Sequence, residues 1–133
     1  MKQTYMLDTN MCVLILNQRP PQLLAVLQGY VEKRHRIVIS SITYAELLFG
    51  DTGFNDSAIK AFMARIDSVL PWDLEAVQAT AKIKQQLGED ASLIGRNDTM
   101  IAGHAIATGS VLITNLSEVF QPVPDLVYND WVE

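Results

Sequence analysis

Short runs of apolar, largely β-branched residues alternate in this sequence with longer segments whose apolar residues recur at helical spacing. Residues 37–39 and 111–113 are runs typical of strands buried on both faces, and 4–7 is a further short candidate strand. Strands that alternate with helices are joined by right-handed crossovers and form a parallel sheet. We therefore predict an α/β fold: a central parallel sheet of four to five strands flanked by helices.

Helix signals fill the segments between these strands. Ser40 and Ser41 are candidate caps, and Gly109 lies where a helix should end. Two further short strands are expected at 69–70 and 126–127, and the chain between 113 and 126 is expected to be irregular. Apolar spacing predicts helices over 9–17, from Pro20 and Pro21 to near Lys33, and over 41–49, 58–66, 74–87 and 100–107.

Size and composition favour one globular domain. The chain has 133 residues, of which 49% are hydrophobic and 19% charged, so we expect a single domain over 1–133 with a packed core. Its one cysteine, Cys12, cannot form an internal disulfide, and no apolar run approaches the ~20 residues of a membrane-spanning helix. No secretory signal follows Met1. These features predict a cytoplasmic protein without a membrane segment.

Polar side chains follow the predicted strands. Asp8 comes directly after the first strand, Glu46 lies one turn into the helix after the second, and Thr114 and Asn115 follow the last buried strand. Asp98 lies in the first turn of the helix that precedes that strand. Because an open parallel sheet binds ligands beyond the carboxyl ends of its strands, we expect these side chains to converge.

Three converging carboxylates repel one another and stay charged only if protons or a cation intervene. Oxygen ligands of this kind select Mg²⁺ or Mn²⁺. Such an ion can lower the pKa of bound water and stabilise the charge that develops when a phosphodiester is attacked. The sequence therefore predicts a magnesium or manganese site formed by Asp8, Glu46 and Asp98.

Each acid also has a purely structural interpretation. Asp8 is a good cap for the helix that follows it, with the next two residues sharing that role. Glu46 stands three residues after Thr43, which is the spacing of a capping box. Asp98 is favoured in a first helical turn by the helix dipole. His104, in an apolar helix, is expected to be a core or interface histidine rather than a base. Taken singly, none of these residues identifies a site.

A net charge of −5 argues weakly against a nucleic-acid ligand, because phosphate backbones bind lysine and arginine. Basic residues nevertheless occur in groups that are candidates for RNA contact. The alternative is a solvated helix end, the usual role of a run of charge. These groups are Lys33, Arg34, His35 and Arg36, and further along the chain Lys82, Lys84 and Arg96.

Five sequence strings surround the three acids and follow one another in a recognisable order. They are 6–10 (MLDTN), 40–47 (SSITYAEL), 94–105 (IGRNDTMIAGHA), 112–115 (LITN) and 129–132 (NDWV). Together they resemble the PIN-domain ribonucleases, specifically the VapC-type toxins of bacterial toxin–antitoxin modules. The likeness spans nearly the whole chain. It is strong because all the strings occur in order at family-like spacing.

The resemblance implies a PIN-like fold and a set of site residues. Many relatives carry a fourth acid or an asparagine directly after the position of Asn115, where this chain has Leu116, and Glu118 is a candidate additional acid. The resemblance makes Asp8, Glu46 and Asp98 the catalytic and metal-binding residues, and places four polar residues beside them: Thr9, Asn10, Thr114 and Asn115.

The resemblance also implies an activity and partners. The family reaction is endonucleolytic hydrolysis of RNA with Mg²⁺ or Mn²⁺, and the anticodon loop of initiator tRNA is a candidate target. A homodimer and a VapB-like antitoxin, assembled into a larger complex, are implied partners. The alternative is a catalytically impaired PIN-fold module that acts mainly through antitoxin binding. Leu116 favours that alternative, and the presence of all three principal acids speaks against it.

Overall fold

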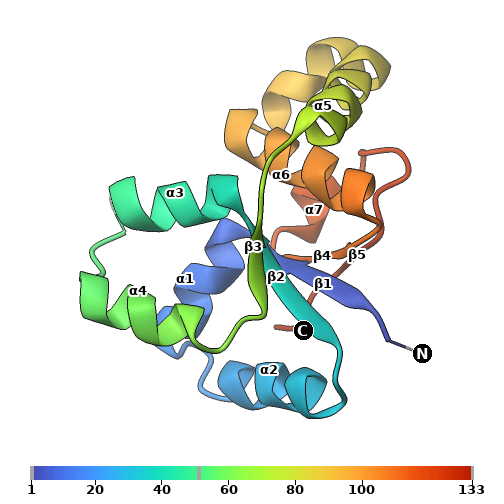
Figure 1. Ribbon diagram of the computed structural model, residues 1–133. Helices are drawn as coiled ribbons and strands as arrows, with labels where there is room; N and C mark the ends of the chain where they lie inside the picture. Colours follow the sequence, from blue (N-terminus) through green and yellow to red (C-terminus); the bar gives the residue numbers. More distant parts are fainter. Residues whose placement is uncertain (1, 51, 133) are drawn as a thin grey trace.

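The computed structural model describes residues 2–50 and 52–132 (Figure 1). Within these residues a five-stranded sheet has the order β3-β2-β1-β4-β5, and every neighbouring pair is parallel. The predicted α/β fold with a parallel sheet is confirmed. The strands are β1 (Thr4–Leu7), β2 (Arg36–Ser40), β3 (Ser68–Leu70), β4 (Val111–Ile113) and β5 (Tyr128–Asn129).

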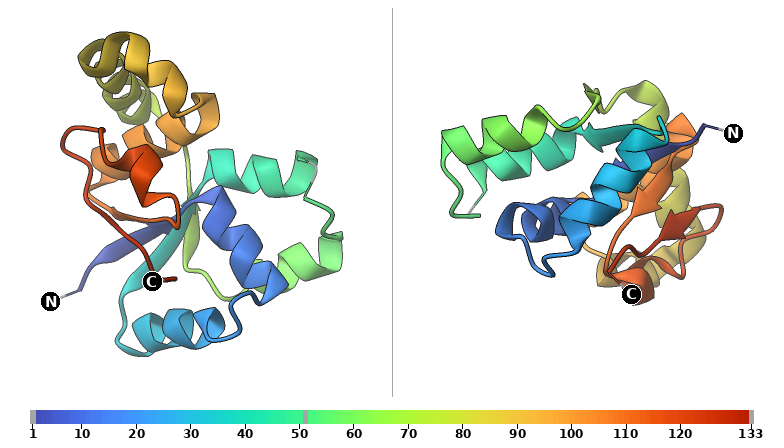
Figure 2. Two further views of the ribbon diagram at one scale, coloured as in Figure 1. Left: turned by 180° about the vertical axis from the view of Figure 1, so that it is seen from behind. Right: turned by 90° about the horizontal axis from the view of Figure 1, so that it is seen from below.

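Helices cover both faces of this sheet (Figures 1 and 2). One face carries α1 (Thr9–Asn17), α2 (Leu23–Glu32), α3 (Ser41–Phe49) and α4 (Asp56–Met63). The other face carries α5 (Leu74–Leu87), the 3₁₀ helix η1 (Gly88–Leu93), α6 (Arg96–Thr108) and α7 (Ser117–Phe120). In the described ranges, no helix combines the length and the apolar character needed to cross a bilayer.

The central strands are buried on both sides, which explains their continuous apolar runs. Successive residues of a strand point to opposite faces, so one strand feeds two cores. The core under α1 to α4 receives Leu7, Ile37, Ile39 and Ile113. The core under α5 to α7 receives Met6, Val38 and Leu112.

Two helix starts in the amino-terminal half of the chain differ from prediction. Pro20 and Pro21 precede α2, which begins at Leu23, so the predicted start in the proline pair is wrong. Helix α4 spans Asp56–Met63 and not 58–66, because the Asn55 side chain caps it by accepting from the Ala58 N–H at 2.8 Å. In both cases the helix end lies two to three residues from its predicted position. A proline or a capping side chain determines where the helix begins.

The carboxyl-terminal third of the chain shows the remaining differences. Helix α6 begins at Arg96 and not at residue 100, because its polar first turn lacks the apolar spacing on which the prediction relied. Strand β5 is Tyr128–Asn129 rather than 126–127, although the Val127 carbonyl already accepts from the Leu112 N–H at 2.9 Å. Helices η1 and α7 lie in segments for which no helix was predicted. Each spans one or two turns, which is too short to show an apolar period in the sequence.

Helix α6, which carries Asp98, packs against α5 at Gly103. A Cβ atom on Gly103 would lie 2.8 Å from the backbone N and 2.9 Å from the Cα of Thr80. Thr80 is fixed in turn by its hydroxyl, which donates to the Ala76 carbonyl at 2.7 Å. The two helices therefore meet at a distance that only glycine allows.

Gly103→Ala is expected to destabilise the protein by about 2 kcal/mol and to lower its melting temperature by about 7 °C, because the neighbouring backbone cannot move away cheaply. Gly29→Ala in α2 is the control, since no described atom beyond its chain neighbours and its own helix backbone lies within 4 Å of the added methyl group. That change should stabilise by about 0.5 kcal/mol through helix propensity. Thermal unfolding followed by circular dichroism measures both. Equal melting temperatures for Gly103→Ala and the parent would contradict the packing.

Candidate active site

The carboxyl ends of three central strands bring Ser40, Asp8 and Thr114 into one row. Strands β2, β1 and β4 run in register up to this point, so the three residues lie side by side. All three are fully buried. This is the edge at which a parallel sheet binds ligands.

Asp8 caps helix α1, but this role accounts for only one of its two carboxylate oxygens. Its Oδ1 accepts a hydrogen bond from the Met11 N–H at 2.7 Å and so caps α1. Its Oδ2 is buried and has no hydrogen-bond partner among the described residues. The capping interpretation therefore accounts for one carboxylate oxygen and leaves the other, buried, unexplained.

Burial raises the pKa of Asp8 from its ordinary value of 3.8 to about 6. The Thr114 hydroxyl is near enough to the carboxylate to lower this pKa, although it makes no hydrogen bond of ordinary geometry to Oδ2. The Met11 amide lowers the pKa as well, and the negative charges of Asp98 and Glu46 raise it further. The pKa of Asp98 is also raised, first by burial and then by Glu46. The three acids therefore lie within electrostatic reach of one another, and a cation among them would relieve both burial and repulsion.

Glu46 is held by α1 from across the site. The Thr9 hydroxyl donates to Glu46 Oε1 at 2.5 Å and lies 3.1 Å from the hydroxyl oxygen of Thr43. The capping-box interpretation of Thr43 is wrong, because the cap of α3 is Ser40, whose Oγ accepts from the Ile42 N–H at 3.1 Å. Thr43 is instead a buried neighbour of the site that the sequence analysis missed. Its spacing of three from Glu46, which puts both on one helix face, was the available signal.

Asn10 and Asn115 close the site on its other side. The Asn10 Nδ2 donates to the Asn115 Oδ1, which ties the first turn of α1 to the loop after β4. Thr114, next in the row, accepts at its Oγ1 from the Leu116 N–H at 2.9 Å. All four polar residues expected beside the acids thus make contacts at this edge.

The acids do not form a closed ligand cluster. Across residues 2–50 and 52–132, no three acidic, histidine or cysteine side chains stand close enough together to hold an ion. Mg²⁺ usually keeps several waters and takes only one or two direct carboxylates, so an open arrangement suits it. The fit to a cation rests on the donor set, which is entirely oxygen, and on the unpartnered Oδ2 of Asp8.

Comparison with known proteins supplies an independent line of evidence. A family model described as "PIN domain" matches residues 5–118. Ribonuclease VapC2 of Rickettsia felis is 33% identical over 96% of this chain and 97% of its own length. The tRNA(fMet)-specific endonuclease VapC of Shigella flexneri is 33% identical with the same coverage. The chain belongs to the VapC-type PIN-domain family. The resemblance predicted from the sequence strings is confirmed.

Solved VapC-type structures share the fold. The structure of VapBC2 from Rickettsia felis bound to a promoter DNA fragment contains a chain that superposes with a TM-score of 0.85 at 30% identity, covering 97% of this chain and 99% of that one. The DNA-bound VapBC structure from Salmonella typhimurium gives a TM-score of 0.83 at 30% identity, with coverage of 98% and 99%. The PIN-like architecture is therefore shown by both sequence and structure.

Leu116, where the family resemblance led us to expect a polar residue, is a packing residue in this chain. Its half-buried side chain contacts the core that contains Phe120 and Val123. Glu118 is exposed on α7 and lines a separate hollow with Leu93. The described carboxylates that shift the pKa of Asp8 are those of Asp98 and Glu46. No described contact joins Glu118 to these acids.

His104 supports the site through a contact with Ser40. It is fully buried on α6, and its Nδ1 lies 2.8 Å from the Ser40 Oγ. Burial lowers its pKa, so the ring is neutral at pH 7. The Trp72 Nε1–H donates to the Met100 carbonyl at 3.0 Å and adds a second link between α6 and the rest of the molecule. The prediction of a core histidine is confirmed.

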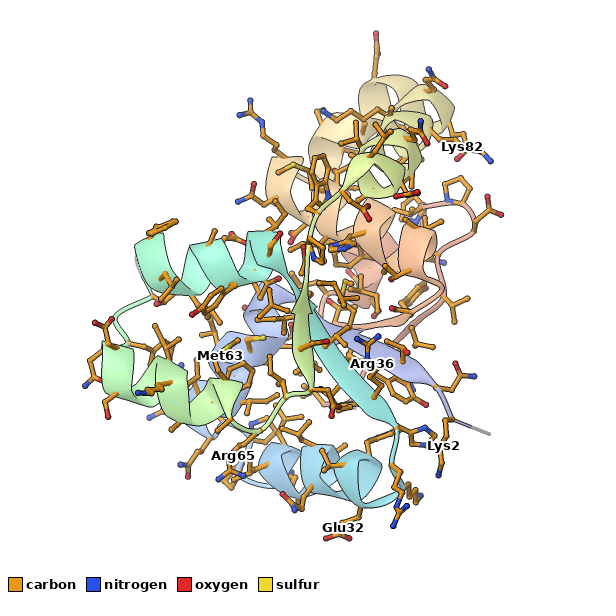
Figure 3. The ribbon with its side chains drawn as sticks, in the orientation of Figure 1. Lys2, Glu32, Arg36, Met63, Arg65 and Lys82 are labelled. Atoms are coloured by element: carbon orange, nitrogen blue, oxygen red, sulfur yellow. The ribbon has the colours of Figure 1, made fainter. Side chains whose placement is uncertain are left out.

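The two groups of basic residues lie in different places. The group at 33–36 lies at the amino ends of the strands, where Arg36 pairs with Thr4. Figure 3 shows Lys2 and Arg36 at this same end of the sheet, opposite the edge that holds Asp8. Lys84 lies on α5 and Arg96 at the start of α6, two residues before Asp98. Of these basic residues, only Arg96 is on an element that also carries one of the three acids.

Proposed function

We propose that this chain is a metal-dependent endoribonuclease, the toxin of a type II toxin–antitoxin pair. The observation that carries the proposal is the electrostatic coupling at one sheet edge of three carboxylates from three separate helices or helix caps. The names of the relatives, a ribonuclease and a tRNA-specific endonuclease, support the same reaction.

The chain's own residues would prepare this reaction by fixing the ligands. Mg²⁺ or Mn²⁺, when bound, supplies an activated water and stabilises the charge that develops on the phosphodiester. Asp8 is fixed by its cap bond to α1, and Thr9 orients Glu46 through the hydroxyl contact. The asparagine pair holds the loop after β4 against α1. The residues that would hold the ion are Asp8, Glu46 and Asp98.

The proposal includes a VapB-like antitoxin, homodimerisation and assembly of both chains into a larger complex. Its support is that the structural neighbours are VapBC complexes. Initiator tRNA is the candidate substrate, because the Shigella flexneri relative is named for it. Such a substrate would place the protein in the cytoplasm.

The competing function is an impaired module that acts only through its antitoxin. Leu116 is the observation in its favour. Against it, the three acids keep their mutual interaction, and Thr9 and the asparagine pair keep their contacts around them. We therefore favour a catalytic nuclease over the impaired module.

The purified protein is expected to cut tRNA and single-stranded RNA in Mg²⁺ or Mn²⁺ and to stop when the ion is chelated. Adding Mn²⁺ back should restore cutting, since the oxygen donors favour both ions. Protein prepared in parallel with Asp98→Asn controls for contaminating nuclease. Sequencing of RNA ends after brief expression would identify the target. Cutting at full rate after chelation would contradict metal dependence.

A further inference from the structure

A basic hollow lies beside Asp98 at the start of α6. Its volume is about 420 Å³. Of the described residues that line it, two are cationic and none is acidic, in a chain whose net charge is −5. The lining comes from the end of α5, from η1 and from the first turn of α6: Lys84, Gly88, Ala91, Ser92, Gly95, Arg96 and Thr99.

The position of this hollow follows from the geometry of α6. Successive residues of a helix are turned by about 100°, so Gly95, Arg96 and Thr99 share one face and Asp98 borders it. Asn97, on the far side of Asp98, lines a second hollow together with Glu46. Asp98 therefore lies on α6 between the residues that line the two hollows, and Glu46 lines the second one. The basic hollow is within about 10 Å of Asp98, the diameter of one helix.

Lys84 and Arg96 are both exposed, so an incoming ligand can reach them. Gly95 caps α6 without a side-chain hydrogen bond, which leaves the first N–H groups of this helix open toward the same region. The other basic group, at 33–36, is at the opposite edge of the sheet. Lys84 and Arg96 are thus two exposed cations beside the first turn of the helix that carries Asp98.

We propose that this hollow binds a backbone phosphate of the RNA strand, one or two nucleotides from the phosphate that is cut. The inference rests on the proposed nuclease function. The planar guanidinium of Arg96 can donate to two phosphate oxygens, and Lys84 adds a point charge from the end of α5. Both are positioning residues. They offset the repulsion that the acidic edge exerts on the strand and fix its register over the carboxylates.

The test uses two variants. One carries both Lys84→Gln and Arg96→Gln, and the control carries Lys82→Gln alone. Lys82, labelled in Figure 3, is exposed on the same helix as Lys84 and lies outside the lining. Binding of a labelled single-stranded RNA is measured by fluorescence anisotropy at several salt concentrations in Mg²⁺, with all proteins also carrying Asp8→Asn to prevent cutting. Circular dichroism checks that each variant is folded.

The double variant is expected to bind RNA about tenfold more weakly and to lose about 0.7 from the salt slope for each phosphate contact removed. Lys82→Gln should match its parent in both. Cleavage is measured on proteins that keep Asp8. There the double variant should have a KM about tenfold higher than the parent and a kcat within about twofold, because a contact remote from the reacting atoms acts on binding.

Equal affinity and equal salt slope for the double variant and Lys82→Gln would overturn the inference. Unchanged RNA binding with weakened antitoxin binding would also overturn it, in favour of an acidic protein segment. The two proposals fail separately. If the parent cuts no RNA but the double variant still loses affinity, the hollow stands without the nuclease. If the parent cuts and the double variant binds like the control, the nuclease stands without the hollow.

Discussion

Replacing Asp98 by asparagine is expected to slow RNA cleavage by about a hundredfold to a thousandfold while leaving the protein folded. Asparagine keeps the size of the side chain and removes its charge. The lost charge is one of three that would hold the ion, and removal of one group that stabilises the transition state has an effect of this size. Asp98 is only half-buried in the first turn of α6, so the fold should tolerate the change. Single-turnover cleavage in Mg²⁺ measures the effect.

Glu118→Gln is the matched control, because it makes the same chemical change at an exposed acid outside the site. It should cut within about twofold of the parent. Growth provides a second readout, since expression of the parent without antitoxin should arrest cells and expression of Asp98→Asn should not. A folded Asp98→Asn protein that cuts at the parental rate would remove this acid from the mechanism.

Replacing Asp8 by asparagine is expected to stabilise the metal-free protein by about 3 kcal/mol at neutral pH. The pKa of Asp8 is raised to about 6, so the folded state is penalised for holding its charge. Asparagine keeps the Oδ1 acceptor that caps α1, and it removes the buried negative charge whose Oδ2 has no described partner. Asp8→Ala loses the cap as well and should gain about 1 kcal/mol less.

The sign of the pH dependence follows from the same shift. Between about pH 4 and pH 6 the folded protein keeps a proton on Asp8 that the unfolded chain has lost, so this group lowers stability as the pH rises through that window. His104 acts in the opposite sense, because its lowered pKa makes the fold lose stability as the pH falls. The contribution of His104 is present in both the parent and Asp8→Asn, so it cancels when their free energies of unfolding are subtracted at each pH. Urea unfolding in chelator that gave the same stability for both from pH 4 to pH 8 would contradict the account.

The parts of the fold that could be predicted are those that leave a local pattern. A strand buried on both faces is a continuous apolar run, which is why 37–39 and 111–113 identified the centre of the sheet. Once the sheet is parallel, the residues after its strands must share an edge, and this placed Asp8 and Thr114 together. The long helices were predictable for the same reason, since their apolar residues repeat at helical spacing.

The parts that could not be predicted depend on contacts between distant segments. Thr43 has the local spacing of a capping box, and only the approach of Thr9, 34 residues away, makes it a neighbour of the site. The contact between Ser40 and His104 spans 64 residues. The basic hollow needs η1, whose six residues show no repeat, to bring Lys84 and Arg96 together.

The direction in which a side chain points also could not be predicted from the sequence. The family resemblance led us to expect a polar residue at position 116, and only the structure shows that Leu116 packs against the core that contains Phe120. The position of Glu118 near it in the sequence suggested a substitute acid. Glu118 lies on an exposed face of α7, and no described contact joins it to the three carboxylates.

Crystals soaked in Mn²⁺ and measured for anomalous scattering test the central claim most directly. The account predicts a peak at the carboxyl edge of the sheet, bound directly or through water by Asp8 Oδ2, Glu46 and Asp98. The same soak of Asp8→Asn crystals should show the peak weakened or gone. Carboxylates that stay apart around an empty edge, with manganese absent or bound only elsewhere, would contradict it.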